Sequence, residues 1–136
     1  MKIYSKFFDT ESSFRNEDEV KAAIKKSKNY KNEDVRSAKS LNFFKTSKQR
    51  SYLIATDDMV YCVVDDNREI SPKVNWSEKK SSFDTSMINI KTKTDRIGLI
   101  DFGEKHKNWF FTKSKFKNNN DLKEKLSELL IGESEG

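Results

Sequence analysis

The residue types that most often perform catalysis or hold metals are scarce in this chain. It has one Cys, Cys62, and one His, His106, so a structural zinc site made of several such ligands within one chain is excluded. Cys62 lies in the apolar run 60–64, where we expect a small buried hydrophobic residue rather than a reactive thiolate. His106 stands between Lys105 and Lys107 in a polar turn, which predicts a solvent-facing side chain.

Other chemical motifs are equally scarce. The four glycines, at positions 98, 103, 132 and 136, are too scattered for a glycine-rich phosphate loop. The sequence Asp65-Asp66-Asn67 lacks the glycine and the closing glutamate of a calcium-binding loop, so we expect a turn there. No spacing in the sequence places an acid–base pair beside a nucleophile. We therefore expect a protein that is not an enzyme and that uses no metal and no cofactor.

Basic residues are the clearest candidates for ligand binding. Residues 21–50 contain ten Lys or Arg and two acidic residues, a net charge of +8, against −3 for the rest of the chain. This surplus would attract nucleic acid, an anionic membrane or an acidic protein, although a solvated surface that keeps the protein in solution is the simpler interpretation. The candidate residues for an anionic ligand are Lys45, Lys48 and Arg50, assisted by Lys25, Lys26 and Lys28.

Aromatic residues form a second set of candidates. Trp109, Phe110 and Phe111 are consecutive in a predicted strand. Successive side chains of a strand point to opposite faces, so the three rings cannot all reach one core. Trp76, in another short predicted strand, raises the same question. Either residues 1–40 cover the outward-facing rings, or Trp76, Trp109 and Phe110 form a contact surface for a partner.

Length and composition limit the class of protein. A chain of 136 residues is expected to be a single domain. Hydrophobic residues make up 34% and charged residues 36%, but ten Phe, four Tyr and two Trp are too many for a disordered chain. No apolar run approaches the roughly 20 residues of a membrane span, and the first residues do not resemble a signal peptide. One Cys cannot form an internal disulfide, so we expect a cytoplasmic protein.

Two amphipathic helices are predicted, one near each end of the chain. Asn16 followed by Glu19 is typical of a capping box, and the apolar stripe beyond it predicts a helix over about residues 17–28. Asn and Asp residues at 118–121 precede the second helix. Its apolar face is predicted to consist of Leu122, Leu126, Leu129 and Leu130.

Between the helices the sequence has the pattern of short strands. Strands are predicted at 41–44, 52–56, 59–64, 74–76, 87–90, 96–102 and 109–112. Asp57-Asp58, between the second and third, predicts a tight hairpin. The expected fold class is therefore α+β. Residues 1–40 form an N-terminal extension, residues 41–131 the strands with the closing helix, and residues 132–136 a frayed tail. The packing of 1–15 and 29–40 is left open.

The order of seven antiparallel strands and one C-terminal helix resembles the pleckstrin-homology superfold, as a divergent or bacterial-type member. The match is most specific over residues 45–61, which are similar to the first loop, second strand and third strand of these domains. The resemblance implies a bent, partly open β barrel closed by the last helix. It also implies contacts with headgroup phosphates for Lys45, Lys48 and Arg50. The tryptophan usual in the last helix of the family is absent from 119–131.

These features favour a non-enzymatic binding or adaptor module. The expected partner is a protein or peptide, received along an exposed sheet edge or in the groove beside the last helix. A peripheral anionic membrane or a phosphorylated headgroup, bound through the basic loop, is the second hypothesis. The alternative class is a nucleic-acid-binding module that uses residues 21–50 and exposed aromatic rings. The sequence leaves the oligomeric state open.

Overall fold

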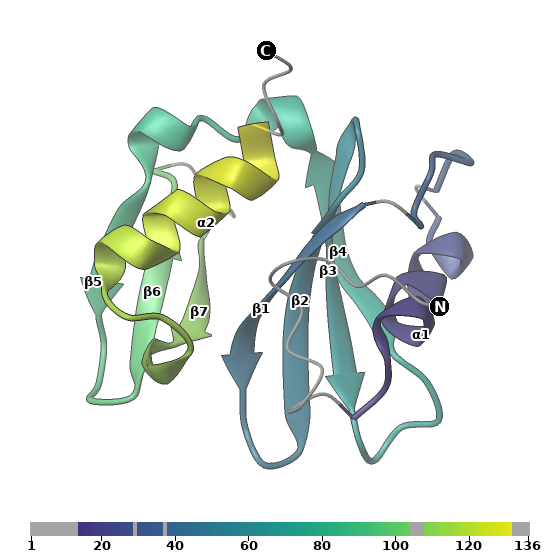
Figure 1. Cartoon of the computed structure of the whole chain (residues 1–136), viewed down its shortest axis with the longest axis horizontal. Coiled ribbons are helices and arrows are strands. Elements are labelled where there is room, and N and C mark those ends of the chain that lie inside the picture. Colours follow the sequence, from purple (N-terminus) through teal and green to yellow (C-terminus); the bar gives the residue numbers. More distant parts are fainter. Residues whose placement is uncertain (1–13, 29, 37, 104–107, 132–136) are drawn as a thin grey trace.

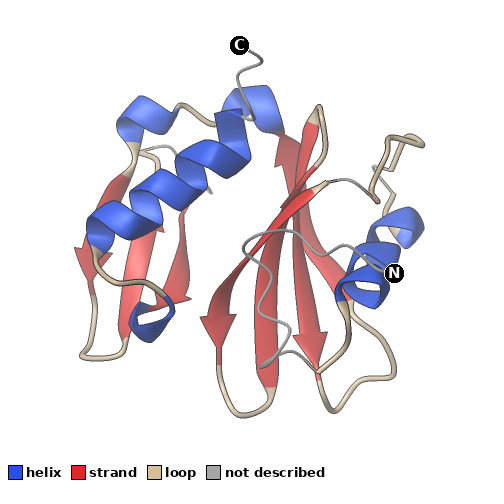
Figure 2. Cartoon of the chain, in the orientation of Figure 1, coloured by secondary structure: helices blue, strands red, loops and turns tan. Residues whose placement is uncertain are grey.

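The computed structural model describes residues 14–28, 30–36, 38–103 and 108–131, which form an α+β fold (Figure 1). One antiparallel sheet contains, in spatial order, β1 (Lys39–Lys45), β2 (Gln49–Ala55), β3 (Met59–Asp66) and β4 (Lys73–Lys79); the other contains β5 (Asn89–Thr92), β6 (Ile97–Asp101) and β7 (Asn108–Thr112). The helices are α1 (Glu17–Ala22), α2 (Asn119–Ile131) and the 3-10 helices η1 (Ala23–Lys26), η2 (Lys80–Ser82), η3 (Thr85–Met87) and η4 (Lys113–Lys115). Figure 2 shows α2 in front of the three-stranded sheet and α1 beside the four-stranded one.

The N-terminal helix begins as its sequence predicts. The Asn16 side chain accepts a hydrogen bond from the Glu19 N–H at 2.9 Å, and the Glu19 carboxylate accepts one from the Asn16 N–H at 3.2 Å, which completes the capping box. The predicted span of 17–28 is too long, because the α-helix ends at Ala22 and η1 continues it to Lys26. A tighter final turn of this kind is common at the C-terminal ends of helices.

The central strands of the four-stranded sheet, β2 and β3, are buried on both faces. On one face, an outer cluster joins α1, η1 and the following segment to the sheet through Val20, Ala23, Ile24, Val35, Ala38, Tyr52, Ile54, Tyr61 and Val63. On the other face, an inner cluster joins it to the three-stranded sheet and α2, with Leu41, Leu53, Val60 and Cys62 among its members. Burial on both sides explains why residues 52–55 of β2 and 59–64 of β3 form continuous apolar runs instead of an alternating pattern.

A β-bulge in β1 allows two adjacent phenylalanines to face the same core. Asn42 pairs with Tyr52 and Phe44 with Ser51, so Phe43 is an extra residue in the strand. In a regular strand Phe43 and Phe44 would point to opposite faces. Here both contact the inner cluster, Phe43 as a buried member and Phe44 from its margin.

The C-terminal helix closes one end of the inner cluster. Leu122, Leu126, Leu129 and Leu130 are each no more than 4% exposed, which confirms the predicted apolar face.

In β6, buried Gly98 and Ile100 alternate with partly exposed neighbours, as expected for a sheet with one face on the core. Gly98 leaves space for the ring of Phe111, which a Cβ at this position would overlap.

The two sheets meet at one corner and do not form a closed barrel. At that corner the Lys45 N–H donates to Thr112 Oγ1 at 2.9 Å, and the Thr112 hydroxyl lies 3.3 Å from the Lys45 carbonyl oxygen. At the other corner β4 and β5 each end a sheet without pairing with one another. The α+β class with seven antiparallel strands is confirmed. The strands lie in two sheets and not in a closed barrel, and the bent, partly open barrel of the pleckstrin-homology type stays a prediction.

The predicted strands are all present, with shifted boundaries. The fifth shows the clearest shift, because it was predicted over 87–90 and begins at Asn89. Residues Thr85–Met87 form η3 instead, and the Asp84 side chain caps it by accepting a hydrogen bond from the Ser86 N–H at 3.0 Å. The apolar pattern alone did not reveal this competing local hydrogen bond.

Candidate functional site

In the predicted basic turn between β1 and β2, two of the three candidate side chains are exposed and the third contacts other residues of the protein. Lys45 and Lys48 are exposed. Arg50 is only 8% exposed, and its Nη1 donates to the carbonyl oxygen of Gln49 at 3.0 Å. Its guanidinium also lies 4.1 Å from the centre of the Phe14 ring. The structure thus brings the three predicted residues to one turn, but Arg50 holds that turn and Phe14 in place.

The second predicted basic group is on another part of the molecule. Lys25, Lys26 and Lys28 are exposed at and just after η1. Figure 1 shows η1 at the right-hand margin and the turn between β1 and β2 at the lower edge. The cationic stretch 21–50 is therefore divided between separate surfaces by the fold.

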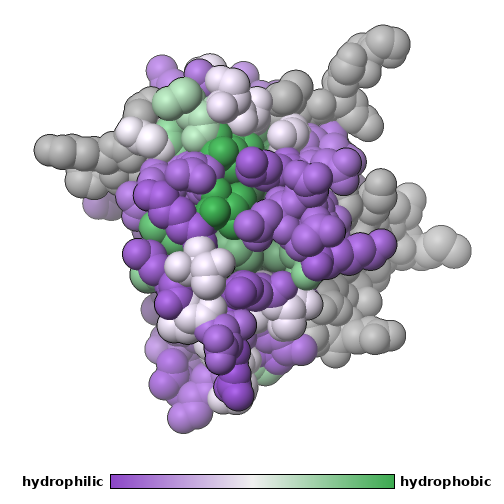
Figure 3. All heavy atoms as spheres, turned by 90° about the vertical axis from the view of Figure 1, so that its left-hand side faces the viewer, coloured by the Kyte–Doolittle hydropathy of each residue, from purple (hydrophilic) through white to green (hydrophobic). Residues whose placement is uncertain are grey.

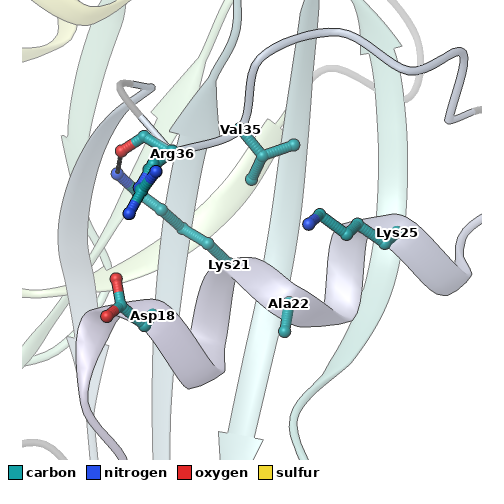
Figure 4. A pocket seen from close by; sticks show the side chains of 6 residues that line it. All are labelled: Asp18, Lys21, Ala22, Lys25, Val35 and Arg36. Carbon is teal, nitrogen blue, oxygen red and sulfur yellow. Dashed lines mark hydrogen bonds between the residues drawn. The ribbon is translucent and has the colours of Figure 1, made fainter.

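Lys21, within the same stretch, has a structural role. Figure 4 shows the pocket of about 290 Å³ that it lines with Asp18, Ala22, Lys25, Val35 and Arg36. Lys21 Nζ donates to the carbonyl oxygens of Arg36 at 3.0 Å and Ala38 at 2.6 Å, and it lies 3.1 Å from Glu17 Oε2. Glu17 is 1% exposed and accepts a hydrogen bond from the Ser40 hydroxyl at 2.7 Å. This network fastens α1 to the start of β1.

Two of the predicted contact aromatics, Trp76 and Trp109, are partly buried in an aromatic cluster. Their ring centres are 5.3 Å apart, and Phe43, Phe83 and Phe102 surround Trp109 at 5.7 to 6.3 Å. Trp109 Nε1 is buried, and no other atom of the described residues forms a hydrogen bond with it. Both indole rings contact the inner cluster and so contribute to its packing.

Phe110 differs from its neighbours in β7. The alternation of the strand buries Phe111, whereas Phe110 points outward and is 52% exposed. It lines an open apolar groove of about 480 Å³ together with Phe44 and Ile97. Among the predicted contact aromatics, this is the ring that the structure leaves most accessible.

A larger groove lies between η1 and β4. Its volume is about 730 Å³, and its lining consists of Ala23, Lys26, Ser27, Lys28, Ser71, Pro72, Lys73, Val74, Asn75, Trp76 and Ser77. Three of these residues are lysines, and none is acidic. Lys73 Nζ is 3.6 Å from Glu69 Oε1, in a solvent-exposed pair that contributes little. The lining is therefore positively charged.

The floor of this groove is an edge strand. β4 pairs with β3 on one side, and no strand of the described residues pairs with its other side. Cys62 pairs with Trp76 and Val63 with Val74, so Asn75 is the extra residue of a bulge. The bulge directs Val74 to the outer cluster and Trp76 to the inner one.

The sequence predicted some residues of this groove as candidates, but it did not predict that they line one groove. Lys26, Lys28 and Trp76 are among the predicted candidates, whereas Lys73 is not. The available signal was Pro72 followed by a short strand, because proline is confined to the ends of strands and to edges. That segment 26–28 lies beside 73–77 follows from tertiary packing alone.

A second hollow, of about 640 Å³, lies near the turn between β2 and β3 and has mixed charge. It is lined by Lys31, Glu33, Asp57, Asp58, Met59, Lys79, Lys80, Ser81, Phe83 and Leu130. Lys80 Nζ donates to the Thr56 carbonyl at 3.1 Å, and burial lowers the pKa of this ammonium group. Because its described lining holds three lysines and three acidic residues, this hollow favours neither sign of ligand charge.

The residues considered for catalysis or metal binding have structural surroundings. Cys62 is 3% exposed, as predicted, and burial raises the pKa of its thiol to about 12. Asp65 accepts hydrogen bonds from Arg15, and Asp66 from Arg68. Within the described ranges, no three His, Cys, Asp or Glu side chains are grouped to hold a metal ion. His106, residues 1–13 and the tail 132–136 lie outside those ranges.

The end of the molecule formed by β5 and α2 was the other expected docking place. Figure 3 shows this face as mostly hydrophilic, with a short hydrophobic strip between polar side chains. Met87, at the end of η3, is 52% exposed. No helix in the described part of the chain has the length and apolar character needed to cross a membrane.

Comparison with family models, with curated proteins and with solved structures finds no significant match to this chain.

Proposed function

We propose that this protein is a non-enzymatic binding module that recognises an acidic, extended segment of a partner protein in the groove between η1 and β4. The observation that carries the proposal is a groove along an edge strand, whose described lining contains three lysines and no acidic residue. The backbone of β4, the lysines and Trp76 contribute differently to recognition.

The backbone of β4 supplies the general attraction. A strand that is paired on one side still has peptide N–H and C=O groups on the other, and an extended peptide can add to them as a further strand. Side chains of such a peptide alternate between the two sides of the added strand. The groove beside β4 has the volume, about 730 Å³, to receive several of them.

The lysines supply the selection for acidic residues. Lys26 and Lys28 border one side of the groove, and Lys73 lies at the start of β4 on the other. Lysines and bulges on edge strands also prevent indiscriminate pairing with other chains. The bulge at Asn75 interrupts the regular edge, so a ligand must gain charge attraction as well as backbone hydrogen bonds.

The position of Trp76 favours a peptide over a single-stranded nucleic acid. Nucleic-acid grooves use aromatic rings as open platforms on which bases stack. Among the described residues of this lining Trp76 is the one aromatic residue, and its ring centre lies 5.3 Å from that of Trp109 and 6.3 Å from that of Phe83. It therefore forms an apolar wall rather than a stacking platform.

The proposal also covers fold family and location. The seven antiparallel strands followed by α2 support membership of the pleckstrin-homology superfold, many of whose members bind peptides. The single cysteine, buried and without a disulfide, supports a cytoplasmic location.

The test uses a fluorescent peptide of alternating Glu and Val, compared with its Lys-Val counterpart. We expect the acidic peptide to bind in fluorescence anisotropy at physiological salt and the basic one not to bind. Lys26→Ser/Lys28→Ser should weaken binding by at least about fivefold, because two charge contacts are lost. The matched control is Lys117→Ser/Lys123→Ser, which removes the same charge from exposed residues outside the groove and should bind normally.

Hydrogen exchange of backbone amides supplies the geometric part of the test. Peptide binding should slow exchange in β4 and leave exchange in β6 unchanged. Equal weakening by both double variants, or binding without protection of β4, would overturn the proposal. Binding of an oligouridine that is lost in Lys26→Ser/Lys28→Ser, with no binding of the peptide, would assign the groove to nucleic acid.

A further inference from the structure

The structure holds a second candidate surface, at the corner where the two sheets meet. We propose that the apolar groove formed by Phe44, Ile97 and Phe110, with its rim of basic residues, docks onto the surface of an anionic lipid bilayer. This proposal is independent of the peptide groove, which lies at the opposite edge of the four-stranded sheet.

Phe110 gives this surface an exposed apolar side chain. It is 52% exposed on the outward face of β7, and the partly exposed Phe44, near the end of β1, lines the same groove. Ile97, at the start of β6, completes the apolar lining. A ring in this position can enter the boundary between headgroups and acyl chains without any change in the core.

Several basic residues lie in or next to the segments that line this groove. Lys93 itself lines the groove, and Lys45 follows Phe44 directly in the chain. Lys113 and Arg96 are joined by a hydrogen bond from the Lys113 N–H to the Arg96 carbonyl at 2.9 Å, beside Ile97. Figure 1 shows the turn between β5 and β6, η4 and the turn between β1 and β2 along the same lower end of the molecule.

The positive charge around this groove favours an anionic surface over a second copy of the chain. The four cations, Lys45, Lys93, Arg96 and Lys113, outnumber the one acidic residue of the nearby turn, Asp95. A symmetric contact with a second copy of the chain would oppose like charges, which costs free energy. An anionic surface would instead attract all four residues, and lysine stems can lie along apolar surface while their ammonium groups reach headgroups.

The described lining of the groove offers few directional groups to a specific polypeptide. Its polar residues are Lys93 and Thr94, and the Thr94 hydroxyl already accepts hydrogen bonds from the N–H groups of Arg96 at 3.2 Å and Ile97 at 3.0 Å. The lining therefore offers mainly apolar contact and diffuse positive charge. A bilayer needs no directional hydrogen bonds, whereas an ordered peptide would leave polar groups unpaired.

The experiment is vesicle flotation of the full chain with phosphatidylcholine vesicles and with vesicles containing about 30% phosphatidylserine, at about 50 and about 150 mM salt. We expect binding to the anionic vesicles alone, weaker at the higher salt. Phe110→Ser should reduce the partition coefficient by roughly fivefold, and Lys93→Ser/Arg96→Ser by roughly 25-fold, since each basic residue near an anionic surface contributes about a factor of five.

Matched controls separate this site from general effects. Ile70→Ser removes another exposed apolar side chain, 97% exposed, and should bind as the native chain does. Lys26→Ser/Lys28→Ser should keep vesicle binding through this groove, so the two proposals fail separately. A polarity-sensitive dye on Phe110→Cys should shift to the blue with anionic vesicles, because buried Cys62 does not compete for the label.

Three outcomes would overturn the proposal. One is the absence of binding to anionic vesicles at the lower salt. Another is unchanged binding of Phe110→Ser with no dye shift, which would reduce the attraction to general charge. The third is concentration-dependent association of the native chain in light scattering that Phe110→Ser abolishes, which would assign the groove to a second copy of the chain.

Discussion

Arg15 and Asp65 are fifty residues apart in the sequence, and the Arg15 Nη1 lies 2.6 Å from Asp65 Oδ1. The Arg15 N–H also donates to Asp65 Oδ2 at 3.1 Å, and the same guanidinium donates to the carbonyl oxygens of Asp66 and Ile70. Asp65 is completely buried. These contacts fix the chain immediately before α1 to the end of β3, and so place η1 beside β4.

We expect Arg15→Ala to destabilise the protein strongly. It would leave the buried carboxylate of Asp65 without its cation, which costs about 2–4 kcal/mol in the free energy of unfolding. Urea denaturation, monitored by circular dichroism, measures this change in the free energy of unfolding. Arg68→Ala, which removes an exposed partner of Asp66, is the control and should shift the midpoint far less. Equal effects of the two variants would contradict a structural role for the Arg15 contact.

Trp109 and Phe110 are neighbours in β7, but truncation is expected to destabilise the protein much more at Trp109 than at Phe110. Trp109→Ala should lower the free energy of unfolding by about 2–4 kcal/mol, because it removes the centre of the aromatic cluster. Phe110→Ala should cost less than about 1 kcal/mol, because the ring is 52% exposed. Thermal denaturation of both variants compares them directly. A larger loss for Phe110→Ala would show that Phe110 packs within the native protein.

Gly98 is expected to tolerate no larger side chain. A Cβ at this position would overlap the ring of Phe111, so Gly98→Ala should destabilise the protein by about 1–3 kcal/mol. The penalty should shrink when Phe111→Leu is introduced as well, and a double-mutant cycle in urea measures that coupling. Strict additivity of the two substitutions would disprove the steric explanation.

Cys62 should be unreactive in the native protein. Burial raises the pKa of its thiol to about 12, so little thiolate exists at neutral or mildly alkaline pH, and reagents do not reach the sulfur. Labelling with Ellman's reagent should be slow without denaturant and fast in urea. Rapid stoichiometric labelling of the folded chain would place the thiol on the surface instead.

Stability should decline in acid because several aspartates are stabilised as carboxylates. Hydrogen bonds from Arg68 and Gln49 lower the pKa of Asp66, and the Gly103 N–H together with Lys91 lowers that of Asp101. As pH falls below the ordinary aspartate value of 3.8, the unfolded chain binds protons before the native one does. The contribution of these ionised aspartates to the free energy of unfolding is therefore fully present above that value. It is lost as the pH falls through their lower pKa values in the native protein.

Melting temperatures measured from about pH 6 to about pH 2 check this prediction. The native chain should show a steep decline at the acid end. Asp66→Asn should be less stable at neutral pH and should show a shallower decline, because one proton-linked group has been removed. Parallel curves for the two proteins would exclude a contribution from Asp66.

The sequence was informative wherever structure depends on near neighbours. The capping box at Asn16, the hairpin at Asp57-Asp58 and the leucine face of α2 are all set by side chains within a few residues of one another. The burial of Cys62 followed from its apolar run. The shift of β5 shows the limit of that reasoning, because a cap at Asp84 took precedence over the apolar pattern.

Long-range packing decided the candidate sites. The sequence indicated a cationic stretch from 21 to 50, but the fold used Lys21 and Arg50 internally and placed the remaining lysines on several separate surfaces. It also brought Lys73 to Lys26 and Lys28, and Phe110 to Phe44. Spacing along a chain predicts local periodicity. Contacts between residues that are distant in the sequence depend instead on strand order, on two bulges and on the contact between Arg15 and Asp65. The sequence by itself therefore determined the elements and their buried faces, and the tertiary structure determined which charges and rings share a surface.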